Sequence, residues 1–350
     1  MSNSHTTFVI GAGASAEVDL PLGKHLKDQI AKALDIQFEY FHQKSGDLQI
    51  TNALRDYLRI NGANETELER LVRKCIQIKD NMKRSSSIDE YLDAHKEDNE
   101  LVLCGKIAIV KAILDAEANS KLQVVGYKEK FNEDEVNDTW FNYFFQIIRR
   151  NISKSNLDSI FDNINIITFN YDRCIEHFLV QRLSEFYDIE RSEAERIARK
   201  LRIYHPYGQV GFLPWQNNGG VRFGEKREAN LLSIAREIKT FTERMDDEEK
   251  INEIKDAISE SKTLVFLGFA YHSQNLDVIK PRKDSLTRRI FGTALGISHI
   301  DQNTIRNDLI NMMTLGDNNV SDLDIQILEV TCEGFFDKFG RTLNAINMID

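Results

Sequence analysis

The first glycine-rich segment of the chain has the residue types that contact phosphate groups. Gly11 and Gly13 follow a short apolar run at 7–10, and Ala12 and Ser15 complete the sequence GAGAS. Glycines let a backbone turn sharply and approach a diphosphate, whose charge is met by amide N–H groups and a helix N-terminus. We therefore expect a phosphate-binding turn that leads into a helix. A tight turn without a ligand is the alternative.

Three polar residues define a second segment, with the pattern T-x-N-x-D. Thr168, Asn170 and Asp172 lie at and just beyond the end of a predicted strand, 165–168. Ligands of open α/β sheets bind at the carboxyl ends of the strands. A carboxamide donates and accepts hydrogen bonds at once, so Asn170 can hold a ribose hydroxyl and a water molecule. The local alternative is a turn at Asn170 and a helix cap at Asp172.

A histidine follows the next predicted strand, 202–204, in the sequence YHPYG. His205 is a candidate general base, because histidine has an ordinary pKa near neutrality. Gly208 ends the same segment. A histidine with a purely structural role is the alternative.

The last of these segments follows the strongest strand signal in the chain, 263–267. Gly268 and Phe269 come directly after that strand, and Gly268 permits a ligand to approach the backbone closely. Asn275 suits a ribose or an adenine edge, whereas His272 is better explained as a helix-start residue. Four segments with this character therefore lie at four predicted strand ends.

The cysteines do not predict a metal site. Cys75, Cys104, Cys174 and Cys332 are far apart, and the chain has no C-x-x-C pair. Structural zinc sites use closely spaced ligand pairs, so none is expected, and a disulfide framework is equally disfavoured. We interpret all four as buried thiols.

The elements that must position these segments alternate as in a doubly wound α/β protein with a parallel, Rossmann-like sheet. Strands are predicted at 7–10, 165–168, 202–204, 263–267, 290–297 and 325–330. Helices are predicted at 22–34, 173–183 and 227–260. Between them, 36–155 has strong helical periodicity and is predicted to be a helical insertion in a single domain covering 1–350, with loops at 43–51 and 119–138.

Composition excludes several classes of protein. The chain has 350 residues, 41% of them apolar and 29% charged, which suits a sizeable core and excludes general disorder. Its net charge of −10 argues against a general nucleic-acid coat, so such contact is expected only indirectly or through a partner. It has no apolar run long enough to span a membrane, and its start does not resemble a secretion signal, so we expect a cytoplasmic protein without membrane contact.

The four segments, GAGAS, TFNYD, YHPYG and LGFAYHSQN, occur in this order at predicted strand ends. In this the chain resembles the sirtuin-like fold, specifically the sirtuin-like NAD-consuming effectors of bacterial antiphage defence. The resemblance covers about 1–34 and 160–300, and SIDEYL at 87–92 resembles part of the helical insertion of those effectors. The chain departs from sirtuin deacylases in two ways: it lacks their zinc module with two cysteine pairs, and Pro206 and Tyr207 separate His205 from Gly208.

The resemblance implies how the site residues act. NAD would bind as the substrate, with its pyrophosphate on Gly11, Ala12, Gly13 and Ser15. Asn170 and Asp172 would organise the nicotinamide ribose and the attacking water, and His205 would act as a base or bind the ribose hydroxyls. Further contacts to NAD would come from Thr168, Gly208, Gly268, Phe269 and Asn275. Nothing in this scheme requires a metal.

The resemblance also implies an activity and partners. It favours an NAD glycohydrolase that forms nicotinamide and ADP-ribose, over a zinc-free protein deacylase or ADP-ribosyl transferase. A catalytically silent nucleotide-binding scaffold is the remaining alternative. Because uncontrolled loss of NAD kills a cell, we expect control by homo-oligomerisation and by a separate partner, such as a HerA-type hexameric ATPase.

Overall fold

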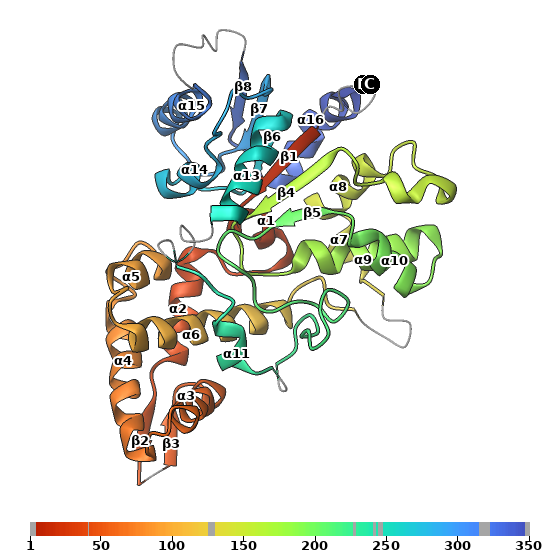
Figure 1. Cartoon of the computed structure of the whole chain (residues 1–350). Coiled ribbons are helices and arrows are strands. Elements are labelled where there is room, and N and C mark those ends of the chain that lie inside the picture. Colours follow the sequence, from red (N-terminus) through yellow and green to blue (C-terminus); the bar gives the residue numbers. More distant parts are fainter. Residues whose placement is uncertain are drawn as a thin grey trace.

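The centre of the molecule is a six-stranded sheet in which all neighbouring strands are parallel (Figure 1). The computed structural model describes residues 5–40, 42–124, 130–226, 229–240, 243, 248–314 and 323–346. From edge to edge the strands are β5 (Arg202–Tyr204), β4 (Ile164–Thr168), β1 (His5–Ile10), β6 (Ser261–Leu267), β7 (Arg289–Thr293) and β8 (Asp324–Leu328). The chain runs from β1 outward to β4 and β5, then restarts at β6 on the other side of β1. The sheet is therefore doubly wound, as predicted.

Helices cover both faces of this sheet. Successive side chains of a strand point to opposite faces, so Phe8 and Ile10 of β1 contact one core and Val9 contacts another. The first core includes side chains of α8 (Trp140–Ile148), α9 (Cys174–Tyr187), α10 (Arg191–Ala198) and α16 (Cys332–Ile346). The second includes those of α13 (Glu248–Glu260), α14 (Ser273–Ile279) and α15 (His299–Met313). The central strands are apolar runs because both of their faces are buried.

A second group of helices lies beside the carboxyl edge of the sheet, where the short α1 follows β1 (Figure 1). Its members form a separate apolar core. They are α2 (Gly23–Ala33), α3 (Leu48–Ile60), α4 (Leu68–Asn81), α5 (Ile88–Ala94), α6 (Asn99–Glu117) and α11 (Leu231–Ala235). Tyr171, just after β4, also belongs to this core, so the helical layer contacts the sheet at the end of a central strand.

The chain between these layers contains short elements. They are α1 (Ala12–Ser15), α7 (Glu133–Val136), and the 3-10 helices η1 (Ala16–Val18), η2 (Glu65–Glu67) and η3 (Lys154–Ser159). The helix α7 falls inside 119–138, which is otherwise irregular where it is described, as predicted. No helix in the described part of the chain is long and apolar enough to cross a membrane.

The predicted loop at 43–51 is wrong. An antiparallel hairpin of β2 (Gln37–Glu39) and β3 (His42–Ser45) lies there, and α3 begins at Leu48. The side chain of Asp47 caps that helix by accepting from the amides of Gln49 and Ile50, at 2.8 and 3.0 Å. The hairpin strands are short and mostly exposed, so they lack the alternating apolar pattern that identifies a strand.

The predicted continuous helix at 227–260 is also wrong. The described residues form α11 and α13, and the segment between them is irregular where it is described; 227–228, 241–242 and 244–247 lie outside the described residues. The reason is tertiary: the Lys239 amide donates to the Tyr207 carbonyl at 2.9 Å, which ties this segment to the loop after β5. That pairing is incompatible with a continuous helix.

The 36–155 block contributes to two of the three cores, the first core on the sheet and the separate helical core. Helices α3 to α6 lie in the separate helical core, whereas α8 packs on the sheet, where Trp140 Nε1 donates to the Ala14 carbonyl at 2.8 Å. The limits of the insertion therefore stay a prediction from the sequence.

Candidate active site

Four loops that follow parallel strands meet at one edge of the sheet. The Gly11 amide donates to the Leu267 carbonyl, and the Gly13 amide donates to the Gly268 carbonyl, both at 3.0 Å. The Phe169 amide donates to the Ile10 carbonyl at 2.9 Å. Backbone hydrogen bonds thus join the loop after β1 to the loops after β6 and β4.

The two glycines of the first loop are required by close contact between backbones. A Cβ atom on Gly11 would lie 2.5 Å from the Gly268 carbonyl oxygen, and one on Gly13 would lie 2.8 Å from Gly268 Cα. Gly268 itself has a φ of +57°, in the left-handed region that favours glycine. The glycines therefore face one another, and a side chain at Gly13 would first displace the loop after β6.

The helix after this turn is shorter than the motif predicts. It begins at Ala12, and α1 has only four residues before η1. The amides of Gly11 and Gly13 already donate hydrogen bonds within the protein, so they are not available to a ligand. The first amides of a helix have no partner within the helix, and Ala12, which is exposed, carries one of them. One turn of helix carries little macrodipole, so a diphosphate here would depend on individual donors.

Asn170 links the end of β4 to the first loop. Its Nδ2 donates to the Gly11 carbonyl at 3.1 Å and to Ser15 Oγ at 2.9 Å. The backbone amide of Asn170 donates to Thr168 Oγ1 at 3.2 Å. The side chain is nearly buried, so Asn170 is held rigidly at the edge of the sheet.

Asp172 lies two residues further along the same loop. Its Oδ1 accepts from the Cys174 amide at 3.1 Å, at the start of α9, and the Ser15 hydroxyl also bonds to the carboxylate. Burial raises the pKa of Asp172, and these hydrogen bonds offset part of the effect. The helix-start role considered as the alternative is therefore present in the structure.

His205 lies beside Asn170 and contacts protein atoms through both ring nitrogens. Nδ1 is 3.3 Å from the Asn170 carbonyl oxygen, and Nε2 is 3.0 Å from Glu176 Oε1. The exposed fractions of the two side chains are 9% for His205 and 2% for Glu176. Burial alone would lower the pKa of His205, but the adjacent Glu176 carboxylate and the Asn170 carbonyl outweigh it, so the pKa is raised.

Glu176 is not among the residues predicted from the sequence. It lies in the first turn of α9, whose other side chains at this end are largely apolar and buried. An acidic residue at a buried helix position is the one signal that could have identified it, because carboxylates are rarely buried without a partner. Its partner, His205, is 29 residues away, and only the fold brings the two together.

The remaining predicted site residues lie around a cluster of rings. Tyr207 donates through its hydroxyl to Asn275 Oδ1 at 2.7 Å. The Phe169 ring meets Tyr207 and Phe269 edge to face, with centroids 5.9 and 5.1 Å apart. Gly208 has a φ of +76°, and a Cβ atom there would overlap the Glu237 carbonyl. Gly208 is therefore explained by close packing, and Asn275 is linked to the site through Tyr207.

The helical layer contacts the same loop through a half-buried aspartate, Asp89. The Tyr171 hydroxyl donates to Asp89 Oδ1 of α5, and burial raises the pKa of both groups. Ser87 Oγ caps this helix by accepting from the Glu90 amide at 3.0 Å, and the Glu90 carboxylate accepts from the Ser86 amide at 2.9 Å.

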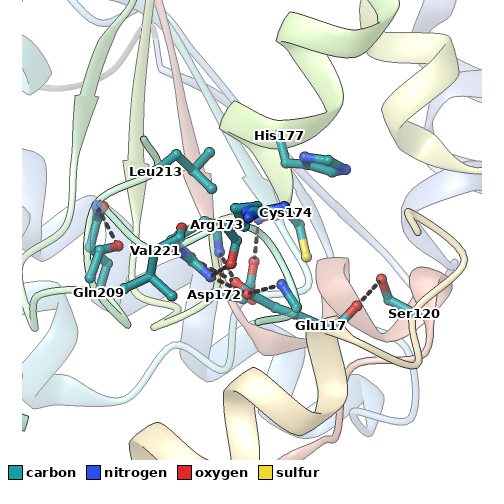
Figure 2. A network of polar contacts seen from close by, with 12 residues as sticks. Glu117, Ser120, Asp172, Arg173, Cys174, His177, Gln209, Leu213 and Val221 are labelled. Carbon is teal, nitrogen blue, oxygen red and sulfur yellow. Dashed lines mark hydrogen bonds and ion pairs between the residues drawn. The ribbon is translucent and has the colours of Figure 1, made fainter. Parts of the chain in front are cut away.

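A fully buried ion pair anchors the start of α9 (Figure 2). Arg173 Nε and the Arg173 amide donate to Glu117 Oε1, at 3.1 and 3.0 Å, and neither side chain is exposed. The Gly224 amide donates to Glu117 Oε2 at 3.1 Å, and Arg173 also donates to the Val221 carbonyl. The pair therefore joins the end of α6, the start of α9 and the segment 221–224.

The described residues include no group of three or more His, Cys, Asp or Glu side chains that could hold a metal ion. All four cysteines are free and buried.

The fold and the site together define an α/β protein whose candidate active-site residues lie at the carboxyl edge of a doubly wound sheet. Residues 164–286 match the family model described as SIR2-like domain. The matched range contains three of the four strand-end segments and leaves out the glycine turn after β1. A comparison with curated proteins finds no match. The family match supports a relationship to sirtuin-like proteins, which use NAD, and an NAD-related activity.

Proposed function

We propose that the protein is an NAD glycohydrolase that cleaves NAD to nicotinamide and ADP-ribose. One observation carries the proposal: Asn170, inside the SIR2-like range, is held at the carboxyl edge of the sheet by hydrogen bonds to Gly11 and Ser15. A carboxamide fixed at this edge suits the positioning of a ribose and a water molecule.

The reaction needs mainly positioning and electrostatic support. The bond between the ribose carbon and the nicotinamide nitrogen breaks, and its electron pair leaves with nicotinamide, whose ring nitrogen is positively charged in NAD. The oxocarbenium-like sugar then takes the oxygen of water, and a proton is released. Asp172 is a buried carboxyl group in the same loop as Asn170, and in its ionised form it favours the positive charge on the sugar.

The test is the release of nicotinamide from NAD by the purified protein, followed by chromatography. We expect Asn170→Ala to reduce the rate by about two to three orders of magnitude, as the removal of a positioning group commonly does. Wild-type turnover in folded Asn170→Ala would refute the proposed role of this residue.

Asn165→Ala is the matched control. Asn165 is a second buried asparagine, and its Nδ2 donates to Thr7 Oγ1 of β1 at 3.2 Å, but it lies within β4, near the end of the strand that is far from the site. We expect this variant to cleave NAD normally when folded. Thermal unfolding of both variants separates loss of activity from loss of structure.

The same assay addresses the alternatives. Nicotinamide release that depends on an added acetylated peptide would indicate a deacylase instead. NAD binding without nicotinamide release would indicate a nucleotide-binding scaffold, in keeping with the engagement of the Gly11 and Gly13 amides within the protein.

We also propose a setting for this activity: antiphage defence, with control by homo-oligomerisation and a partner such as a HerA-type hexameric ATPase. The support is the resemblance of the four strand-end segments to defence effectors. Light scattering on the purified protein tests the oligomer, and a plain monomer at micromolar concentration would contradict it.

A further inference from the structure

The His205 ring has an acceptor beside each of its nitrogens. The neighbour of Nδ1 is the Asn170 carbonyl oxygen, which can only accept a hydrogen bond. The neighbour of Nε2 is the Glu176 carboxylate, which also accepts when ionised. With an ionised Glu176, both contacts are hydrogen bonds only when both nitrogens carry a proton, that is, in the imidazolium form.

Glu176 lies between His205 and a small cavity. Its Oε2 atom is buried and has no hydrogen-bond partner among the described residues, and the residue lines a cavity of about 170 Å³. Arg199, Trp215 and Gln216 lie on the wall of the same cavity.

The two charged groups that raise the pKa of the His205 ring, Glu176 and Asp172, are both negative. Glu176 of α9 contacts the ring directly, and Asp172, from the loop before α9, also raises the pKa of the ring. Arg199 of α10 lies at the cavity that Glu176 lines, and its guanidinium donates to the Trp215 carbonyl. The nearest charges therefore stabilise a protonated ring.

We propose that Glu176 is a positioning residue that holds the His205 ring as an imidazolium, whose Nδ1–H group fixes the Asn170 carbonyl. On this assignment, which rests on the proposed function, His205 orients the Asn170 loop and does not accept a proton. The two roles predict opposite pH dependence. A base loses activity as the pH falls, whereas an imidazolium that positions Asn170 loses its effect as the pH rises.

The first arm of the experiment measures the histidine directly. NMR of ring-labelled histidine follows the titration of the eight histidines, and the resonance missing in His205→Gln identifies His205. We expect His205 in the wild type to remain protonated above the ordinary histidine pKa, and Glu176→Gln to lower its pKa. A wild-type His205 ring that is neutral at pH 7 would overturn the proposal, whatever the variants do.

The second arm measures NAD cleavage against pH. We expect wild-type kcat to fall as the pH rises through the pKa of His205, and Glu176→Gln to lower kcat at pH 8 roughly 10- to 100-fold with little change in KM, as a small misplacement of a positioning group does. Gln216→Ala alters the same cavity without removing a contact of His205, and should leave kcat and its pH dependence unchanged. A loss of kcat on the acid side that follows the His205 titration would overturn the proposal.

The two arms separate the proposals from each other. If the wild type cleaves no NAD, the glycohydrolase function is refuted, and the His205 resonance alone decides whether Glu176 holds an imidazolium. If NAD is cleaved but Glu176→Gln changes neither the resonance nor the pH profile, the function stands and the role of Glu176 is refuted.

Discussion

At the scale of single residues, His177 makes the free energy of unfolding depend on pH. The ring is buried, its Nε2–H donates to the Leu122 carbonyl at 2.9 Å, and it stacks on Phe223 with centroids 4.1 Å apart. Burial lowers the pKa of His177 to about 3. In the unfolded chain the ordinary value is 6.5, so below that pH the unfolded state binds a proton that the folded state does not.

The free energy of unfolding should therefore fall as the pH drops from 6.5 toward 3. For this one group the expected loss is about 2 kcal/mol between pH 7.5 and pH 5. Urea unfolding of the wild type and of His177→Gln at both pH values measures it, because the variant keeps a donor but does not titrate. Equal losses in the two proteins would show that His177 is not the group responsible.

At the scale of elements, the contact between the loops after β1 and β6 depends on Gly268. The residue has a φ of +57°, and a Cβ atom there would overlap the backbone of Gly13 and Ala14. We expect Gly268→Ala to reduce the free energy of unfolding by about 3 to 4 kcal/mol, from backbone strain and overpacking together. The loop after β1 also accepts hydrogen bonds from Asn170, through Gly11 and Ser15. NAD cleavage should therefore fall in the fraction of the protein that remains folded.

Gly296→Ala is the matched control for that prediction. Gly296 has a similar φ of +74°, but no atom lies within 4 Å of an added Cβ. Only the backbone strain applies, so we expect a loss of about 1 to 2 kcal/mol. Similar losses at the two positions in chemical denaturation would show that the close approach of the loops does not contribute.

For the molecule as a whole, the Arg173–Glu117 pair connects the helical layer to the sheet. Glu117 is the last residue of α6, Arg173 immediately precedes α9, and both side chains are fully buried. Removing one partner leaves an uncompensated buried charge. We therefore expect Arg173→Met to reduce the free energy of unfolding by about 3 to 5 kcal/mol.

Two further variants test that reason. Arg196→Met removes an exposed ion pair with Asp158 and Glu193, and should leave the free energy of unfolding nearly unchanged. Adding Glu117→Leu to Arg173→Met removes the stranded carboxylate, so stability should be partly recovered. If the double variant is less stable than Arg173→Met alone, the stranded charge is not the cause.

The sequence by itself determined the elements and residues that depend on local patterns. Apolar, β-branched runs identified the central strands, because a strand buried on both faces needs such side chains along its length. Gly11, Gly13 and Asn170 follow such runs, whereas His205 follows a short strand that is partly exposed. All four do lie at the carboxyl edge of the sheet.

Only the tertiary structure decided how these residues meet. The pairing of Lys239 with Tyr207 interrupts a stretch that has helical periodicity, and the partner of His205 is a glutamate 29 residues earlier in the chain. Glycines that suggested a ligand contact proved to face the backbone of another loop. Periodicity reports which side of an element is buried, whereas the partner across the interface depends on the path of the whole chain, which no local pattern contains.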